Sequence, residues 1–134
     1  LAQMSAVENV EFSLSVSGAK VKNKKDLCVN WLERLGIRER RNHMPAEMSG
    51  GEQARVAISR ALVHSPKLVL ADEPTSELDS KTSFRVVDLF RELVDKEGLT
   101  IVMTTHDVNI MDAADHIFTM EDGVIVSERK GNRA

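Results

Sequence analysis

The sequence contains a single cysteine, Cys28, so an internal disulfide bond is excluded. One unpaired thiol fits a reducing cytoplasm. The apolar runs are short, as at residues 68–71, whereas a membrane-spanning helix needs roughly 20 apolar residues. The N-terminus lacks the charged and then apolar pattern of a secretory signal, and no N-glycosylation acceptor occurs. We therefore expect a soluble intracellular domain.

Positive charge is not in excess either. The 134 residues include 18 Lys and Arg against 21 Asp and Glu, which gives a formal net charge of -3. Because surfaces that bind nucleic acid are usually basic, no nucleic-acid partner is expected. The hydrophobic share of 42% is sufficient for one compact domain with one core.

The stretch MSGGEQARVAISRAL, which begins at Met48, predicts a helix with an unusual start. Ser49 is a good N-cap, and Glu52, three residues later, completes a capping box. Gly50 and Gly51 then occupy the first two helical positions, where glycine costs stability. A helix start without Cβ atoms offers bare backbone N–H groups to an anion. The sequence therefore predicts an anion site at these two glycines.

The remaining pattern predicts helices first and an α/β arrangement second. Helices are expected over residues 5–14, 26–37, 80–98 and 107–114. Continuous apolar runs at 67–72 and 99–105 are typical of strands that are buried on both faces of a parallel sheet. Residues 115–128 predict a hairpin with Gly123 in its turn. The fold class is therefore α/β, with parallel strands, crossover helices and a C-terminal hairpin.

Two expectations concern side chains. The buried face of the helix over 80–98 should contain Phe84, Val87, Phe90 and Val94. Core packing is the preferred interpretation of Trp31, and a solvated loop or helix start is preferred for the four lysines of residues 17–25.

Acidic and imidazole side chains follow the two expected strands. Asp72 and Glu73 end the first, and His106 follows the second. In open α/β sheets, ligands bind at the carboxyl ends of the strands. A carboxylate there can hold Mg²⁺ through water near phosphates, and its neighbour can accept a proton from an attacking water. Taken singly, the acids could be surface residues, His106 a polar cap and Asp79 a helix N-cap.

Three motifs occur in a fixed order: SGGEQ (49–53), LVLADEPTSELDS (68–80) and IVMTTHD (101–107). Together they resemble the C-terminal half of an ABC-type ATPase, over about residues 5–129. SGGEQ resembles the family's signature motif, with Glu52 where many members have Gln. LVLADE resembles the Walker B strand, SELD (76–79) resembles the D-loop, and His106 resembles the switch histidine. Each motif is weak alone, but the set is highly specific.

The resemblance implies ATP and Mg²⁺ as cofactors and a role for each matched residue. Asp72 would help to position Mg²⁺, Glu73 would be the general base for the hydrolytic water, and His106 would contact the γ-phosphate. The signature motif would close over nucleotide that is bound by the opposite subunit, and the D-loop would line the subunit boundary. The implied cofactor-binding residues are Ser49, Gly50, Gly51, Glu52, Gln53, Ser76 and Asp79.

The resemblance also implies an architecture and partners. The fold would be a partial P-loop NTPase fold, with part of the helical subdomain in residues 1–47 and the signature helix and α/β core in 48–134. A second copy would form a homodimer, and a membrane-spanning permease would be the other partner. The chain would be cytoplasmic and peripheral at the inner face of the cell membrane. Within the family, it most resembles the lipoprotein-releasing and macrolide-exporter group.

No P-loop of the form G-x-x-x-x-G-K-S/T occurs in the chain. The P-loop supplies the main phosphate cradle, so the chain alone is expected to bind ATP weakly at best and not to hydrolyse it. A trimmed piece of a full ATPase is favoured because Leu1 begins inside a recognisable segment; a natural partial protein is the alternative. Exposed sheet edges or apolar faces should then drive pairing with another copy or with the absent segment.

Three other functions fit these residues less well. The C-terminal ATPase lobe of a DNA-repair or chromosome-structure protein would also lack a P-loop, but residues 1–40 show no sustained heptads. Translation factors of the ABC type usually have Asn-His in the D-loop, where this chain has Ser76 and Glu77. The set of motifs disfavours a purely structural domain.

Overall fold

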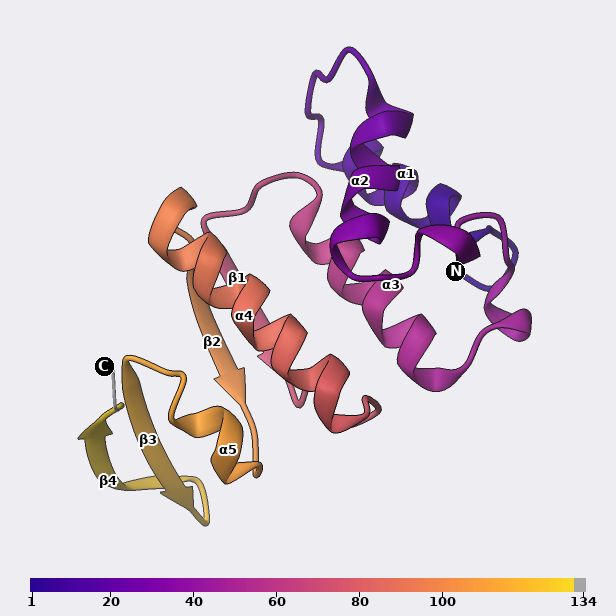
Figure 1. Cartoon of the computed structure of the whole chain (residues 1–134). Helices are drawn as coiled ribbons and strands as arrows, with labels where there is room; N and C mark the ends of the chain where they lie inside the picture. The colour runs from indigo at the N-terminus through magenta and orange to yellow at the C-terminus, as the bar shows by residue number, and fades with distance from the viewer. Residues whose placement is uncertain (132–134) are drawn as a thin grey trace.

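The computed structural model describes residues 1–131 of the chain (Figure 1). Three helices and two short 3₁₀ helices come first: α1 (Ala6–Val16), α2 (Lys24–Arg34), η1 (Arg38–Arg40), η2 (Pro45–Glu47) and α3 (Gly50–Leu62). An α/β segment follows, with β1 (Leu68–Asp72), α4 (Ser80–Glu97), β2 (Thr100–Thr104), α5 (Val108–Met111), β3 (His116–Glu121) and β4 (Val124–Lys130). The predicted order of helices and strands is confirmed.

The first three helices pack on one another and share a core. A capping box starts α1, because the Ser5 hydroxyl accepts the N–H of Glu8 while the Glu8 carboxylate accepts the N–H of Ser5 at 2.7 Å. On α2, Cys28 is fully buried and Trp31 is nearly so, which confirms the core interpretation of Trp31. The guanidinium of Arg34 lies 4.5 Å from the centre of the Trp31 ring, within cation–π range.

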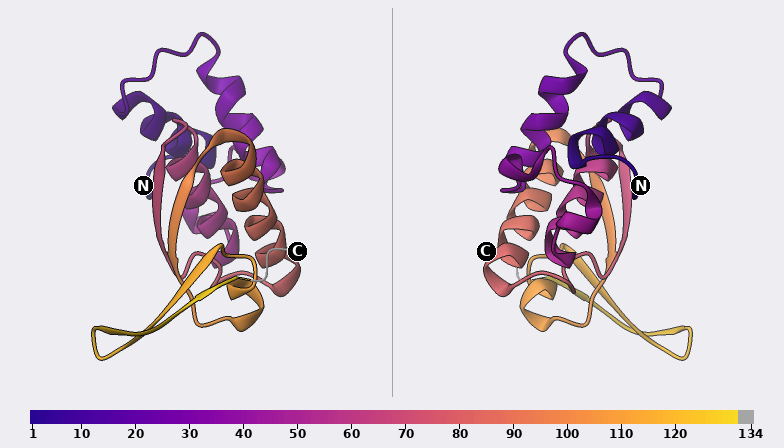
Figure 2. Two further views of the ribbon diagram at one scale, coloured as in Figure 1. Left: turned by 90° about the vertical axis from the view of Figure 1, so that its left-hand side faces the viewer. Right: turned by 90° about the vertical axis from the view of Figure 1, so that its right-hand side faces the viewer.

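Strands β1 and β2 pair in parallel, with Asp72 opposite Thr104, and α4 forms the crossover between them. Helices α3 and α4 lie on the same side of these strands (Figure 2). Val69 is buried towards the helices, whereas Leu70 on the other face is 75% exposed and Val102 beside it is 56% exposed. The expectation that both faces are buried is therefore wrong, because helices cover only one of them.

Helix α4 follows its predicted course, but its buried face is turned. Gly98 ends it in the left-handed conformation, with a φ of 68°, which is typical of a glycine C-cap. The buried face passes through Val86, Phe90 and Leu93, and Phe84 is therefore 49% exposed. The expectation of a buried side chain is confirmed for Phe90 and wrong for Phe84, which points away from the buried face.

The C-terminal hairpin forms a separate two-stranded sheet of β3 and β4. Its two turn residues, Asp122 and Gly123, both have positive φ angles, of 48° and 79°, which is the backbone of a type I′ hairpin turn. The predicted hairpin with Gly123 in the turn is confirmed. Residues 1–131 contain no helix with the length and apolar character that crossing a membrane requires.

Candidate functional site

The carboxyl ends of β1 and β2 bring together Asp72, Glu73, Thr104 and His106. The Thr104 hydroxyl donates a hydrogen bond to Oδ1 of Asp72, the residue opposite it in the register. The N–H of Glu73 donates to the carbonyl oxygen of Thr104 at 3.2 Å and lies 3.1 Å from its hydroxyl. Thr104 was not identified from the sequence, although its position as a polar residue ending an apolar strand could have indicated it. It fixes the two acidic residues relative to β2.

Glu73 and His106 form the chemical centre of this strand edge. Oε1 of Glu73 lies 2.9 Å from Nδ1 of His106, and both side chains are open to solvent. The hydrogen bond that Glu73 accepts from His106, and then the negative charge of Glu73, raise the pKa of His106. Glu73 itself has a left-handed backbone, with a φ of 43°, which turns the chain sharply at the end of β1. The two predicted catalytic residues are therefore in direct contact.

The signature motif starts α3 as predicted. Ser49 is the N-cap, its hydroxyl accepts the N–H of Glu52 at 3.2 Å, and the Glu52 carboxylate accepts the N–H of Ser49 at 2.9 Å. Oε1 of Glu52 also pairs with Nε of Arg40 at 2.9 Å. The hydrogen bond from the Ser49 backbone, and then Arg40, lower the pKa of Glu52. Arg40 is a site contact that the sequence did not indicate.

Gln53 also has partners within the chain. Its side-chain amide donates to the carbonyl oxygens of Pro45, at 2.9 Å, and Met48, at 3.2 Å, and so holds η2 against the start of α3. The side chains of Glu52 and Gln53 thus stabilise the local fold. Their predicted contact with nucleotide stays a prediction.

The D-loop, residues 76–79, leads from the end of β1 into α4. Asp79 caps α4: Oδ1 accepts the N–H of Thr82 at 3.1 Å and Oδ2 accepts its hydroxyl at 2.6 Å. The hydrogen bond from the Thr82 side chain, followed by the one from its backbone, lowers the pKa of Asp79. This confirms Asp79 as a helix N-cap, and its contact with nucleotide stays a prediction.

The D-loop lies against the signature motif of the same chain. A Cβ atom on Gly51 would stand 2.9 Å from the backbone oxygen of Glu77 and 3.4 Å from Leu78, and one on Gly50 would stand 3.2 Å from Oε2 of Glu77. Contacts between Cβ and oxygen below 3.0 Å essentially do not occur. The absence of a Cβ atom at Gly51 therefore lets the D-loop backbone approach α3.

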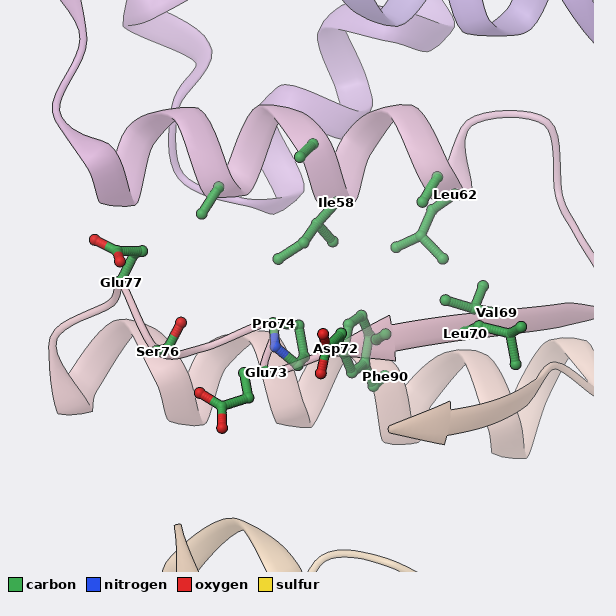
Figure 3. A pocket seen from close by; sticks show the side chains of 14 residues that line it. Ile58, Leu62, Val69, Leu70, Asp72, Glu73, Pro74, Ser76, Glu77 and Phe90 are labelled. Carbon is green, nitrogen blue, oxygen red and sulfur yellow. The ribbon is translucent and has the colours of Figure 1, made fainter. Parts of the chain in front are cut away.

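A cavity of about 300 Å³ separates α3 from β1 and the D-loop (Figure 3). One end is apolar, with Ile58, Leu62 and Val69, and the other end is polar, with Asp72, Glu73, Ser76 and Glu77. Among residues 1–131, no three His, Cys, Asp or Glu side chains are grouped so as to hold a metal ion by themselves. The exposed carboxylate of Asp72 at the end of β1 nevertheless fits Mg²⁺, which is commonly held by one or two carboxylates together with phosphate oxygens.

A sequence model of the ABC transporter family matches residues 1–76, more than half of the chain. The chain belongs to the ABC transporter family. It is 43% identical to an uncharacterized ABC transporter ATP-binding protein of Bacillus subtilis, over 100% of this chain and 58% of that protein. It is 44% identical to the lipoprotein-releasing system ATP-binding protein of Legionella pneumophila, over 92% of this chain and 54% of that protein. It is also 44% identical to a macrolide export ATP-binding/permease protein of Chlorobaculum tepidum, over 97% of this chain and 20% of that protein.

A solved structure agrees with the fold. The chain superposes with a TM-score of 0.91 and 36% identity on the ATP-binding cassette MJ0796, a dimer in a post-hydrolysis state bound to ADP and Pi. The match covers 97% of this chain and 58% of that one. The predicted fold and the resemblance to the lipoprotein-releasing and macrolide-exporter group are confirmed. The chain spans only about half of the length of the lipoprotein-releasing relative, 54%.

Proposed function

We propose that the chain is part of the ATP-binding and ATP-hydrolysing subunit of an ABC-type membrane transporter. The contact between Glu73 Oε1 and His106 Nδ1, at 2.9 Å, carries this proposal. Hydrolysis of the phosphoanhydride bond to the γ-phosphate of ATP needs a group that accepts the proton of the attacking water and a donor that faces the phosphate oxygens. Relatives that are named as ATP-binding proteins of transporters support this interpretation over that of a DNA-repair ATPase.

The roles of the side chains follow from their contacts. Glu73 is the general base, with its carboxylate held beside His106 and open to solvent. His106 uses Nδ1 for Glu73, so its Nε2 is left for an oxygen of the γ-phosphate. Asp72, oriented by the Thr104 hydroxyl, would hold Mg²⁺, which neutralises charge on the phosphates when it is bound.

The N-terminal turn of α3 would bind phosphate oxygens through Ser49, Gly50 and Gly51. The Ser49 hydroxyl accepts the N–H of Glu52, so its own proton can be donated to a phosphate. The N–H groups of Gly50 and Gly51 have no carbonyl partner within the helix, and the helix dipole favours an anion there. This arrangement supports a phosphate site at the signature motif.

The partners proposed are a second ATPase subunit and a membrane-spanning permease, with the chain at the cytoplasmic face of the membrane. The dimeric state of the solved cassette supports the first partner. A relative that is named as an ATP-binding/permease protein supports the second. Residues 1–47 are proposed to belong to the helical subdomain that contacts the permease. That this chain alone does not hydrolyse ATP stays a prediction.

Substitution of Glu73 tests the proposed function. In the intact protein, Glu73→Gln should slow ATP hydrolysis by roughly 100- to 10,000-fold, because the amide cannot accept the proton of water. ATP should then accumulate in a stable dimer, which is measured by size-exclusion chromatography beside a phosphate-release assay. Glu121→Gln, on the exposed hairpin, is the matched control and should hydrolyse ATP normally. Turnover of Glu73→Gln at the wild-type rate would show that Glu73 is not the base.

A further inference from the structure

We propose that the carboxylate of Glu77 acts as an internal anion at the start of α3 and competes with the phosphate that this helix start binds. Glu77 belongs to the D-loop, which the proposed function places at the subunit boundary. The inference rests on that proposed function, because it concerns the same phosphate site. It adds a residue that tunes the affinity of the signature motif for its ligand.

The position of Glu77 is the first support. Its Oε2 lies 3.2 Å from where a Cβ of Gly50 would stand, and its backbone oxygen lies 2.9 Å from where a Cβ of Gly51 would stand. Figure 3 shows the Glu77 carboxylate beside the N-terminal end of α3, apart from Glu73 and Asp72. Two oxygen atoms of one residue thus lie in the space that the two glycines leave open.

The electrostatics of the helix start are the second support. The first turn of α3 carries unbonded N–H groups and the positive end of the helix dipole, which attract a carboxylate as they attract a phosphate. The other acidic residue of this turn, Glu52, is paired with Arg40 at 2.9 Å. In the part of the chain that the structure describes, no ion pair includes Glu77. Its negative charge therefore lies beside the start of α3 without an ion-pair partner.

Together, these two observations predict that a phosphate approaching the start of α3 is repelled by Glu77. The Glu77 side chain is exposed, so it can rotate away, but its charge stays near as long as the D-loop backbone lies over Gly51. Like charges at such a distance repel, and the repulsion lowers the affinity of the site. Removing the charge while keeping the shape of the side chain should therefore strengthen phosphate binding.

The experiment uses the 134-residue chain labelled with ¹⁵N and titrated with inorganic phosphate at constant ionic strength. The backbone amide signals of Gly50 and Gly51 report binding. We expect Glu77→Gln to bind phosphate roughly two- to five-fold more tightly than the wild-type chain, the size of a single charge effect at a helix end. Glu121→Gln removes the same charge from the hairpin and should leave the affinity unchanged.

The outcomes separate this inference from the proposed function. If both amides shift with phosphate and the wild-type and Glu77→Gln affinities are equal, Glu77 does not compete and the inference fails, while the phosphate site stands. Weaker binding by Glu77→Gln also overturns the inference, because Glu77 would then assist the ligand. If neither amide shifts in any variant, the helix start of this chain does not bind phosphate, and the inference fails together with the proposed phosphate site at Gly50 and Gly51, whereas the role of Glu73 is tested separately by Glu73→Gln.

Discussion

Glu73 combines a full side chain with a backbone conformation that usually belongs to glycine. Its φ of 43° costs about 1–3 kcal/mol for a residue with a Cβ atom. The surrounding contacts hold it there: its N–H bonds to Thr104, and its carboxylate bonds to His106. The turn takes the chain out of β1 while leaving the carboxylate at the strand edge. The strained backbone therefore places the carboxylate beside His106.

The pairing of Glu73 with His106 should be visible in the titration of the imidazole. The pKa of His106 is higher in the folded chain than in the unfolded chain. The pairing therefore stabilises the fold below the unfolded pKa, and this stabilisation is lost as the pH rises through the folded pKa. Glu73→Gln in the 134-residue chain should lower this pKa towards the ordinary value of histidine. An NMR pH titration of the His106 ring measures it. An unchanged His106 titration would show that the two side chains do not interact in solution.

The sequence identified the strand-end residues but not their contacts. Asp72, Glu73 and His106 could be predicted because each follows an apolar run, which is a local signal. The hydrogen bond from Thr104 to Asp72 depends on the register of β1 against β2, which is set by the packing of the crossover helix. The proximity of Glu77 to the signature motif depends on the path of the D-loop. Neither is encoded in the spacing of residues along the chain.

At the scale of elements, the starts of helices were predictable and their buried faces were not. Capping boxes at Ser5 and Ser49 and the cap at Asp79 use side chains within three residues of the N-cap, so the sequence contains the whole signal. The exposed positions of Leu70 and Phe84 were missed because burial depends on which elements lie opposite. Local chemistry thus defines the elements, and tertiary packing selects the faces that they bury.

The contact between the signature motif and the D-loop gives a matched pair of variants. In Gly51→Ala, the new Cβ meets the backbone oxygen of Glu77 at 2.9 Å, so one of the two backbones must move. In Gly50→Ala, the Cβ meets only the flexible end of the Glu77 side chain. We expect the free energy of unfolding of Gly51→Ala, measured by urea denaturation, to be about 1–3 kcal/mol lower than that of Gly50→Ala. Equal stability of the two variants would mean that the loop does not press on α3.

At the scale of the whole molecule, the parallel sheet has an apolar face that the described residues leave uncovered. The face of β1 and β2 that points away from the helices presents Leu68, Leu70 and Val102 to solvent. The sequence predicted exposed apolar faces from the missing P-loop, and this part of the expectation is confirmed by the exposed side chains. Apolar surface of this kind on a folded domain usually marks a contact with another chain or segment.

Self-association should therefore depend on this sheet face. In sedimentation velocity experiments, the wild-type chain should associate as its concentration rises, and Leu70→Lys should shift it towards the monomer, because a charge cannot be buried there cheaply. Val16→Lys adds the same charge at an equally exposed position, at the end of α1, and should associate like the wild type. A wild-type chain that stays monomeric at every concentration would contradict the expectation.

The thiol of Cys28 can report the separation of the first three helices. Its thiol is fully buried on α2, and burial raises its pKa to about 11, so it is unreactive while the first three helices are packed. A thiol reagent can reach it only when these helices separate. Because no other cysteine competes for the reagent, the rate of labelling measures the opening of this helical part alone. Any partner that holds the helices together would slow that rate, whatever surface it binds.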